Sequence, residues 1–256
     1  MIDPWVLPVM AGVLGLALGS FLNVCALRWP QDESVIRPPS RCPGCRENVR
    51  WYDNLPVLSW VLLRGRCRSC GTGISPQYPL VELATGLIWG GMVVVQGFEV
   101  EALRGAILLT ILLGIAVSDA RFYIIPDQFT IGGAALGLLL AFFSPALGPL
   151  EALVGMVVGF GLLWFTAWAG KKVFKKEAMG GGDIKMMALI GAFLGVQGVF
   201  LALFLAAFLG AVIFGPISIR TGKLVPFGIF LAAGAALTYG WGEWMVEWYM
   251  AWAFGV

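Results

Sequence analysis

Two sets of side chains in this chain can do chemistry: a pair of aspartates and a group of four cysteines. Asp119 ends one long apolar run, and Asp183 follows three glycines directly before another. Carboxylates at the edges of membrane-length apolar segments are costly and tend to be functional. The chain has no histidine, which excludes histidine as a general base, as an activator of a nucleophile and as a metal ligand. We therefore expect acid and base catalysis to rest on carboxylates.

Asp119 and Asp183, 64 residues apart, are the candidates for a catalytic pair. Because two carboxyl groups held close together do not both ionise easily, one of them keeps its proton. The ionised partner can take a proton from a water molecule that attacks a peptide carbonyl. The protonated partner can bind the carbonyl oxygen and then help to protonate the leaving amine. This route to peptide hydrolysis needs neither a metal nor a nucleophilic side chain.

A structural interpretation is available for only one of these two aspartates. Asp119 lies at the C-terminus of a predicted helix, where the helix macrodipole disfavours a carboxylate, so a functional role explains it better. Asp183 can instead cap a helix that begins at Ile184. The glycines before Asp183 allow positive φ and leave room for another backbone, such as an extended peptide, to approach. They are Gly180, Gly181 and Gly182.

Two further charged residues lie near this pair in sequence. Asp127 follows Pro126 just before an apolar run, which favours its interpretation as a helix cap. Lys185 follows Asp183 by two residues, and its charge also fits a role in setting membrane topology. Both residues are candidates for a supporting role in the loop around the aspartate pair.

The composition is that of a membrane protein with several spans. The chain is 59% hydrophobic and 12% charged, about half the charged fraction of a soluble domain. We predict an all-α polytopic membrane protein with about eight transmembrane helices, in which the short segment at 184–196 is either a half-helix or continues into the next. The eight apolar segments lie at about 5–27, 79–96, 103–118, 129–147, 150–170, 184–196, 198–219 and 226–241.

The distribution of lysine and arginine predicts the orientation in the membrane. If the N-terminus lies outside the cytoplasm, 16 of the 17 basic residues fall in cytoplasmic loops, and only Arg104 lies outside. The loops concerned include 28–68, 171–185 and 220–223. The C-terminus then also lies outside. Both aspartates fall at the cytoplasmic edge of the membrane, which is required if they are to meet.

The cysteines form two Cys-x-x-Cys pairs with 21 residues between them, Cys42 with Cys45 and Cys67 with Cys70. This spacing is close to that of a zinc ribbon, in which four thiolates complete a closed, structural tetrahedral site. Two disulfides are the main alternative, which a cytoplasmic location disfavours. Nucleic-acid binding is not expected, because the arginines of this loop also fit topology. Cys25 reads as a buried apolar side chain.

Several segments resemble one known family, the bacterial type IV prepilin leader peptidases, which are intramembrane aspartic proteases. The run 180–183 is similar to the Gly-x-Gly-Asp motif of that family, and Asp119 matches the position of its other catalytic aspartate. In the late segment that begins at Pro226, Ile229 stands where another proline is expected. Further segments similar to the family lie at 19–24, 54–59, 65–70, 78–82, 126–130 and 226–228.

The resemblance implies a function and a domain organisation. The substrates would be type IV prepilins and type II secretion pseudopilins, whose basic leader is cut after a glycine at the cytoplasmic edge of the bacterial inner membrane. Many members also methylate the new N-terminus with S-adenosylmethionine, although no glycine-rich motif here places that cofactor. The expected parts are a first transmembrane helix at 1–27, a cytoplasmic zinc module at 28–77 and a seven-helix peptidase core at 78–256.

Two other classes of protein share some of these features. Transporters also carry intramembrane acids and helices broken at glycine, but they often consist of two similar halves, and no internal repeat is visible here. A membrane-anchored scaffold that docks partners through the zinc loop would leave both aspartates unexplained. The peptidase is therefore the favoured interpretation.

Overall fold

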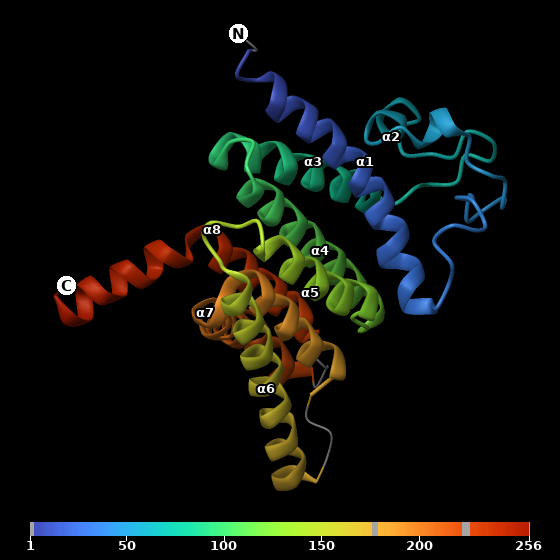
Figure 1. Cartoon of the computed structure of the whole chain (residues 1–256). Helices are drawn as coiled ribbons and strands as arrows, with labels where there is room; N and C mark the ends of the chain where they lie inside the picture. Colours follow the sequence, from blue (N-terminus) through green and yellow to red (C-terminus); the bar gives the residue numbers. More distant parts are fainter. Residues whose placement is uncertain (1–2, 176–178, 222–225, 256) are drawn as a thin grey trace. The chain divides into compact units, whose positions relative to one another are not determined.

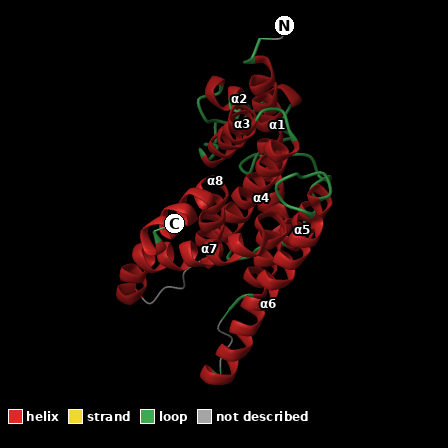
Figure 2. Cartoon of the chain, turned by 60° about the vertical axis from the view of Figure 1, so that its left-hand side comes forward, coloured by secondary structure: helices red, strands yellow, loops and turns green. Residues whose placement is uncertain are grey.

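The computed structural model of this chain describes residues 3–175, 179–221 and 226–255. Everything it describes is helix or loop, with no β-strand (Figure 2). The predicted all-α fold is confirmed. Lys176 and Lys223, which belong to the predicted cytoplasmic charge, lie outside the described residues. The α-helices are α1 Val6–Arg28, α2 Leu58–Leu62, α3 Gln77–Gln96, α4 Val100–Phe122, α5 Asp127–Ala141, α6 Pro149–Phe174, α7 Gly181–Thr221 and α8 Phe227–Phe254 (Figure 1).

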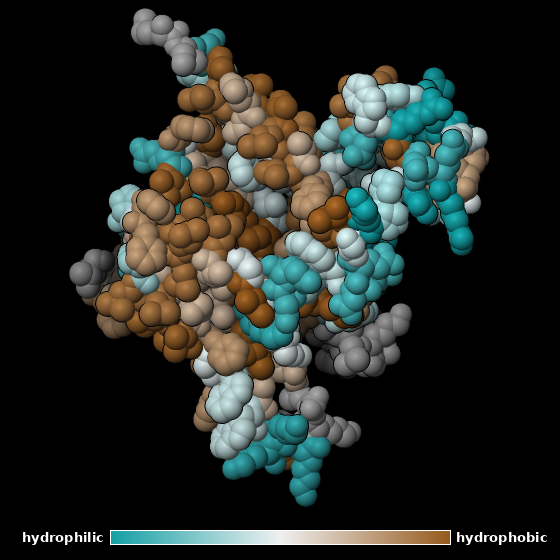
Figure 3. All heavy atoms as spheres, turned by 45° about the vertical axis from the view of Figure 1, so that its right-hand side comes forward, coloured by the Kyte–Doolittle hydropathy of each residue, from teal (hydrophilic) through white to brown (hydrophobic). Residues whose placement is uncertain are grey.

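The predicted apolar segments coincide with these α-helices, except that α5 ends at Ala141 and the rest of the segment predicted at 129–147 is a loop. Within the described residues, five helices are long and apolar enough to cross a membrane, and α5, with 15 residues, is shorter. Hydrophobic side chains cover the visible faces of the helices, whereas hydrophilic ones gather over the loop that carries α2 (Figure 3). An apolar surface of this extent fits a hydrocarbon environment, so the membrane class is confirmed. The five spans are Val6–Gln31, α3, α4, Pro149–Val173 and Gly181–Phe214.

The helix α7 contains the break expected in this part of the sequence. The segments predicted at 184–196 and 198–219 form one helix that is interrupted at Gly195, where φ is 66° and ψ is −171°. This backbone conformation is readily adopted only by glycine. A Cβ at this position would also lie 3.0 Å from Leu147 Cδ1 and 3.2 Å from Glu151 Oε1. The break therefore follows from Gly195, two residues before the position inferred from the apolar pattern.

The chain divides into two compact units, Met1–Thr110 and Ile111–Val256. In the first unit α1 packs against α3, and a Cβ at Gly19 of α1 would lie 2.7 Å from Glu82 Cα. In the second unit α7 packs against α5, α6 and α8, and it meets α6 where Gly155 faces Gly191. Small residues at such crossings let helix backbones approach closely, as is common in membrane helices.

Candidate active site

Asp119 lies in the last turn of α4 and is buried, with 5% of its surface exposed. Its Oδ2 accepts a hydrogen bond from the backbone N–H of Ile229 at 3.2 Å, and the N–H of Gly228 also donates to this carboxylate. Both donors belong to the first turn of α8. A helix N-terminus favours a negative charge, which offsets the unfavourable position of Asp119 at the end of its own helix.

Gly228 brings the start of α8 close to this carboxylate. A Cβ at position 228 would lie 2.8 Å from Asp119 Oδ2, so any larger residue would displace the acid. In the sequence, 226–228 can be recognised only as a segment similar to one in a known family. A proline and a glycine before an apolar run signal a helix start. They do not reveal which side chain its N–H groups bind.

Asp183 lies in the first turn of α7, which begins at Gly181 and therefore earlier than the predicted start at Ile184. Its carboxylate accepts a hydrogen bond from the backbone N–H of Gly180. A side chain that reaches back in this way acts like the acidic residue of a capping box. Capping therefore contributes to the position of Asp183. The Asp183 carboxylate can still accept further hydrogen bonds, because each of its oxygens has two lone pairs.

The two aspartates are brought together in the second compact unit. They are close enough for the charge of Asp119 to act directly on Asp183. Each is part-buried or buried, and each receives backbone N–H donors at a helix N-terminus. Like charges this close favour a state in which the pair holds one proton, which is the state that general acid and base catalysis requires.

The three glycines before Asp183 have different surroundings, and none of them adopts positive φ. A Cβ at Gly181 would meet nothing within 4 Å, whereas a Cβ at Gly182 would lie 2.9 Å from Ile125 Cβ. At Gly180 the nearest atom would be Asp183 Oδ2 at 3.4 Å. The expected open approach therefore exists at Gly180 and Gly181, but Gly182 is packed against another part of the protein.

Asp127 does not cap α5, so the capping interpretation is wrong. The N-cap of α5 is Pro126, and no side chain makes a capping hydrogen bond there. Asp127 is the first residue of the helix, where its charge is favoured by the macrodipole. Both of its carboxylate oxygens accept from Lys185 Nζ at 2.7 Å. This exposed ion pair links the start of α5 to the first turn of α7.

The four cysteines converge in the first compact unit. Their Sγ atoms all lie within 4.8 Å of one another, and all four thiols are free of disulfides. Tetrahedral zinc with Zn–S bonds of about 2.3 Å places its sulfurs about 3.8 Å apart, and Cys42 Sγ lies 3.6 Å from Cys70 Sγ. The donor set therefore fits zinc, and no disulfide joins these four cysteines.

The two halves of this cysteine site are built alike. The N–H of Cys42 donates to Glu47 O at 3.0 Å, and the N–H of Cys67 donates to Thr72 O at 2.8 Å. Backbone N–H groups of Cys45 and then Gly44 lower the pKa of the Cys42 thiol. The hydroxyl of Thr72, helped by its N–H, lowers the pKa of Cys70 to about 6. One thiolate, which is the metal-binding form, is thus favoured at each turn. At Cys45 the N–H of Glu47 lowers the pKa, but desolvation and the neighbouring thiols outweigh it and raise the pKa to about 12.

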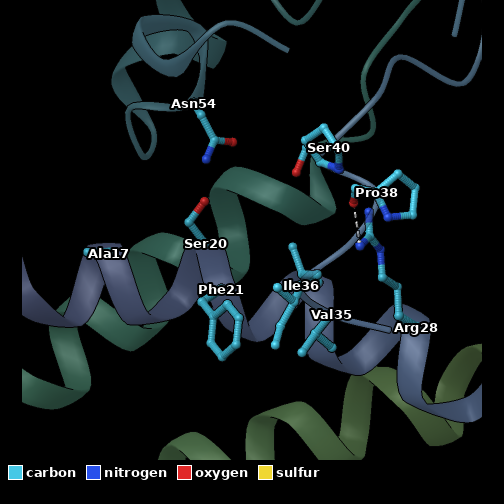
Figure 4. A pocket seen from close by; sticks show the side chains of 11 residues that line it. Ala17, Ser20, Phe21, Arg28, Val35, Ile36, Pro38, Ser40 and Asn54 are labelled. Atoms are coloured by element: carbon cyan, nitrogen blue, oxygen red, sulfur yellow. Dashed lines mark hydrogen bonds between the residues drawn. The ribbon is translucent and has the colours of Figure 1, made fainter. Parts of the chain in front are cut away.

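A pocket of about 260 Å³ lies beside the cysteine module, between α1 and the loop that follows it (Figure 4). Ser20 and Asn54 face it with polar groups, and Phe21 presents an aromatic ring. The guanidinium of Arg28 donates to Pro38 O at 2.8 Å across its rim. The pocket thus combines an apolar wall with a cationic group and several neutral hydrogen-bonding groups.

Comparison with known proteins gives matches along most of the chain. Residues 13–96 match the bacterial peptidase A24 N-terminal domain, and residues 106–215 match the type IV leader peptidase family. No solved structure matches the chain.

Three relatives, each described as a prepilin leader peptidase/N-methyltransferase, show the extent of the similarity. The protein from Stutzerimonas stutzeri is 35% identical in an alignment of 281 positions, gaps included. This alignment covers 98% of this chain and 96% of the relative. The one from Aeromonas hydrophila is 35% identical over 96% of this chain and 95% of the relative. The one from Myxococcus xanthus is 41% identical over 84% of this chain, which spans only 64% of that longer relative.

Proposed function

The chain belongs to the type IV leader peptidase family, and we propose that it cuts the leader peptide from type IV prepilins and type II secretion pseudopilins, with Asp119 and Asp183 as the catalytic pair. The observation that supports this assignment is that Asp119, bound by the first turn of α8, and Asp183, in the first turn of α7, lie near enough for the charge of one to act on the other. A scaffold would leave this pair unexplained, and family membership favours neither a scaffold nor a transporter.

The surroundings of the two acids suggest their roles. Two backbone N–H groups, from Gly228 and Ile229, point at Asp119, so we assign it the ionised form and the role of general base. Asp183 then carries the shared proton. In this assignment Asp119 takes a proton from the attacking water, and Asp183 binds the carbonyl oxygen and later donates its proton toward the leaving amine.

The open face at Gly180 and Gly181 supports an extended substrate strand at this site. A peptide that is helical in the membrane has to unwind before its backbone can be cut. Because neither glycine presents a side chain, a strand can approach the start of α7 closely there. This gives the glycine run a role in substrate binding, while Gly182 serves internal packing.

The membrane placement follows from charge. We propose that the protein lies in the bacterial inner membrane with both termini outside the cytoplasm, because 16 of the 17 basic residues then face inward. Asp119 and Asp183 lie at the cytoplasmic edge in this orientation. That is the side on which a basic leader peptide is found before secretion.

We propose a structural zinc ion at Cys42, Cys45, Cys67 and Cys70. The four thiols fit a closed tetrahedral site, and a closed site supplies folding energy without an open position for substrate. The ion would hold together two turns that have little apolar core of their own. It would have no part in peptide hydrolysis.

For N-methylation of the new N-terminus we propose S-adenosylmethionine, which supplies the methyl group, in the pocket beside α1. Phe21 offers a face for its adenine and Asn54 a polar group, and the Arg28 guanidinium, which also binds Ser34 O and Pro38 O, supplies a positive charge at the rim for its carboxylate. Calorimetric titration of the purified chain with S-adenosylhomocysteine tests this site. Asn54→Ala is expected to weaken binding, and unchanged binding in that variant would exclude the pocket.

The peptidase assignment is tested with the detergent-solubilised chain and a purified prepilin. The wild type is expected to release the leader peptide, and Asp119→Asn and Asp183→Asn are each expected to reduce kcat by at least about 10²-fold, since each removes one partner of the acid and base pair. Mass spectrometry of the product identifies the bond that is cut. Cleavage at the wild-type rate by either variant would refute the pair.

A further inference from the structure

The turn between α4 and α5 is fixed to the end of α4 that carries Asp119. Ser118, which is fully buried and directly precedes Asp119, donates its hydroxyl to Ile124 O at 2.6 Å. The N–H of Tyr123 donates to Asp119 O at 3.0 Å, and Tyr123 has a φ of 55°. The residues that follow Asp119 therefore turn back sharply and remain beside it.

From this turn, Ile125 contacts both regions that hold the aspartates. A Cβ at Gly182, directly before Asp183, would lie 2.9 Å from Ile125 Cβ. A Cβ at Gly228, whose N–H binds Asp119, would lie 2.8 Å from Ile125 Cδ1. One isoleucine side chain thus packs directly on the backbone of the first turn of α7 and on that of α8.

We propose that Ile125 is a positioning residue that sets the separation of the Asp119 and Asp183 carboxylates. This inference rests on the proposed function, because it assigns the pair a working distance. Ile125 lies between two glycines that leave no room for a side chain, so the first turns of α7 and α8 approach each other only as far as the isoleucine allows. Its branched Cβ restricts χ1, which makes it a stiff spacer.

The two contacts of Ile125 involve different atoms, and this makes the inference specific. Position 182 faces its Cβ, which an alanine at position 125 retains. Position 228 faces its Cδ1, which an alanine lacks. Ile125→Ala should therefore loosen the start of α8 and leave the contact with the start of α7. Ile125→Val, which keeps the branch but not Cδ1, should have an intermediate effect.

The experiment measures cleavage kinetics of the purified full chain with a prepilin substrate. Ile125→Ala is expected to lower kcat by about 10- to 100-fold with little change in KM, because a shift of about 1 Å in reacting groups has effects of this size. The pH–rate profile should become broader, because carboxylates that approach each other more closely interact more strongly and the two limbs move apart. A residue with a merely structural role would not move this profile.

Two controls match these substitutions within the second unit. Ile131→Ala removes an isoleucine of α5 that is 56% exposed, and Gly132→Ala adds a Cβ that meets nothing within 4 Å. Both are expected to cleave at the wild-type rate. Thermal unfolding of every variant separates lost positioning from lost folding.

Double variants give the decisive comparison. Gly182→Ala and Gly228→Ala are each expected to lower kcat about 10²-fold. Adding Ile125→Ala should restore only part of the activity of Gly228→Ala, since it removes Ile125 Cδ1 but leaves Asp119 Oδ2, the other atom 2.8 Å from the new Cβ. It should restore none of the activity of Gly182→Ala, because the alanine keeps the Cβ that position 182 faces. Equal coupling in both pairs would overturn the inference.

The outcomes also separate this inference from the proposed function. If Asp119→Asn is inactive but Ile125→Ala keeps the kcat and the pH profile of the wild type, the catalytic pair stands and the positioning role is wrong. If the wild type itself cuts no prepilin, the proposed function and this inference are both overturned.

Discussion

The cysteine site and the aspartate pair are assembled in opposite ways. The four thiols come from two turns of like construction, each closed by local backbone hydrogen bonds. The aspartates come from two helices: Asp119 is held by N–H groups from the start of α8, which is distant in sequence, and Asp183 by the N–H of nearby Gly180. The first site is made of side chains that are present. The second also requires glycine at positions 182 and 228, where any side chain would clash with its neighbours.

This contrast decides how each site should respond to change. Loss of one cysteine removes a ligand that the others cannot replace, and the consequence is local unfolding. At the aspartate pair, replacing an acid should stop chemistry and leave the fold, whereas adding a methyl group at a packed glycine should disturb geometry.

The largest effect is expected from changing an acid to its amide within the second unit. Asp183→Asn should lower kcat by about 10²- to 10⁴-fold, because it removes a group that moves a proton in the reaction. Asp127→Asn is the matched change at an acid with its side chain 53% exposed, which is bound to Lys185. It should retain cleavage, because an exposed ion pair contributes at most about 1 kcal/mol to stability. Complete loss of cleavage by a folded Asp127→Asn chain would place this acid in the catalytic pair.

The next effect concerns the metal. The wild type should contain about one zinc ion per chain by elemental analysis, and Cys67→Ser should contain none. Limited proteolysis should then cut Cys67→Ser within 28–77, because the two turns lose their common ion. Cys25→Ser changes a buried cysteine outside the site and should keep the zinc. A metal-free wild type prepared under reducing conditions would contradict the zinc assignment.

A smaller effect is expected where the module joins the helices of the first unit. Glu82 of α3 is buried, and its Oε2 accepts from the N–H of Val57 at 2.7 Å. Glu82→Ala should leave that N–H without a partner and cost about 1–3 kcal/mol of stability. This loss of stability is measured by heating the variant and using protease sensitivity to detect unfolding. Glu99→Ala, outside this contact, serves as the control, and equal unfolding midpoints for the two variants would show that Glu82 does not hold the module.

The smallest effect is a dependence of module stability on pH. The guanidinium of Arg68, which donates to Asp53 at 2.6 Å, holds the pKa of that carboxyl below its usual range. Because the pKa is lower in the folded chain, the stabilisation is present above the unfolded-state pKa and is lost as the pH falls through the folded-state pKa. Asp53→Asn should therefore slightly lower the unfolding midpoint at neutral pH and have no effect in strong acid. A difference that persists unchanged in acid would disprove the assignment.

The sequence predicted some parts of this molecule for sound physical reasons. Two Cys-x-x-Cys pairs can converge because each pair spans a single turn, so local spacing is sufficient. The break in α7 was visible as a short apolar segment, although its position at Gly195 depends on a backbone angle. The unfavourable place of Asp119 at a helix C-terminus correctly marked it as unusual.

Other features could not be predicted because they depend on contacts between distant residues. The start of α8 compensates the charge of Asp119 through backbone N–H groups, which leave no trace in residue type. Gly181 and Gly182 look alike in sequence, yet only the second is packed against Ile125. Asp127 seemed to be a cap because a partner 58 residues away, Lys185, cannot be inferred from local pattern.

The break at Gly195 separates residues 181–194 from the rest of α7, and Asp183 lies near the free end of this short helical segment. Twelve residues separate the two positions, so the segment between them is about 18 Å long, and a tilt of about 3° displaces the carboxylate by about 1 Å. This segment packs closely against α6 near the break, where Gly155 faces Gly191. Crowding where Gly155 faces Gly191 would therefore cause a larger displacement at Asp183 than at the contact itself. We expect the alignment of the two acids to depend partly on the packing of α6 against α7.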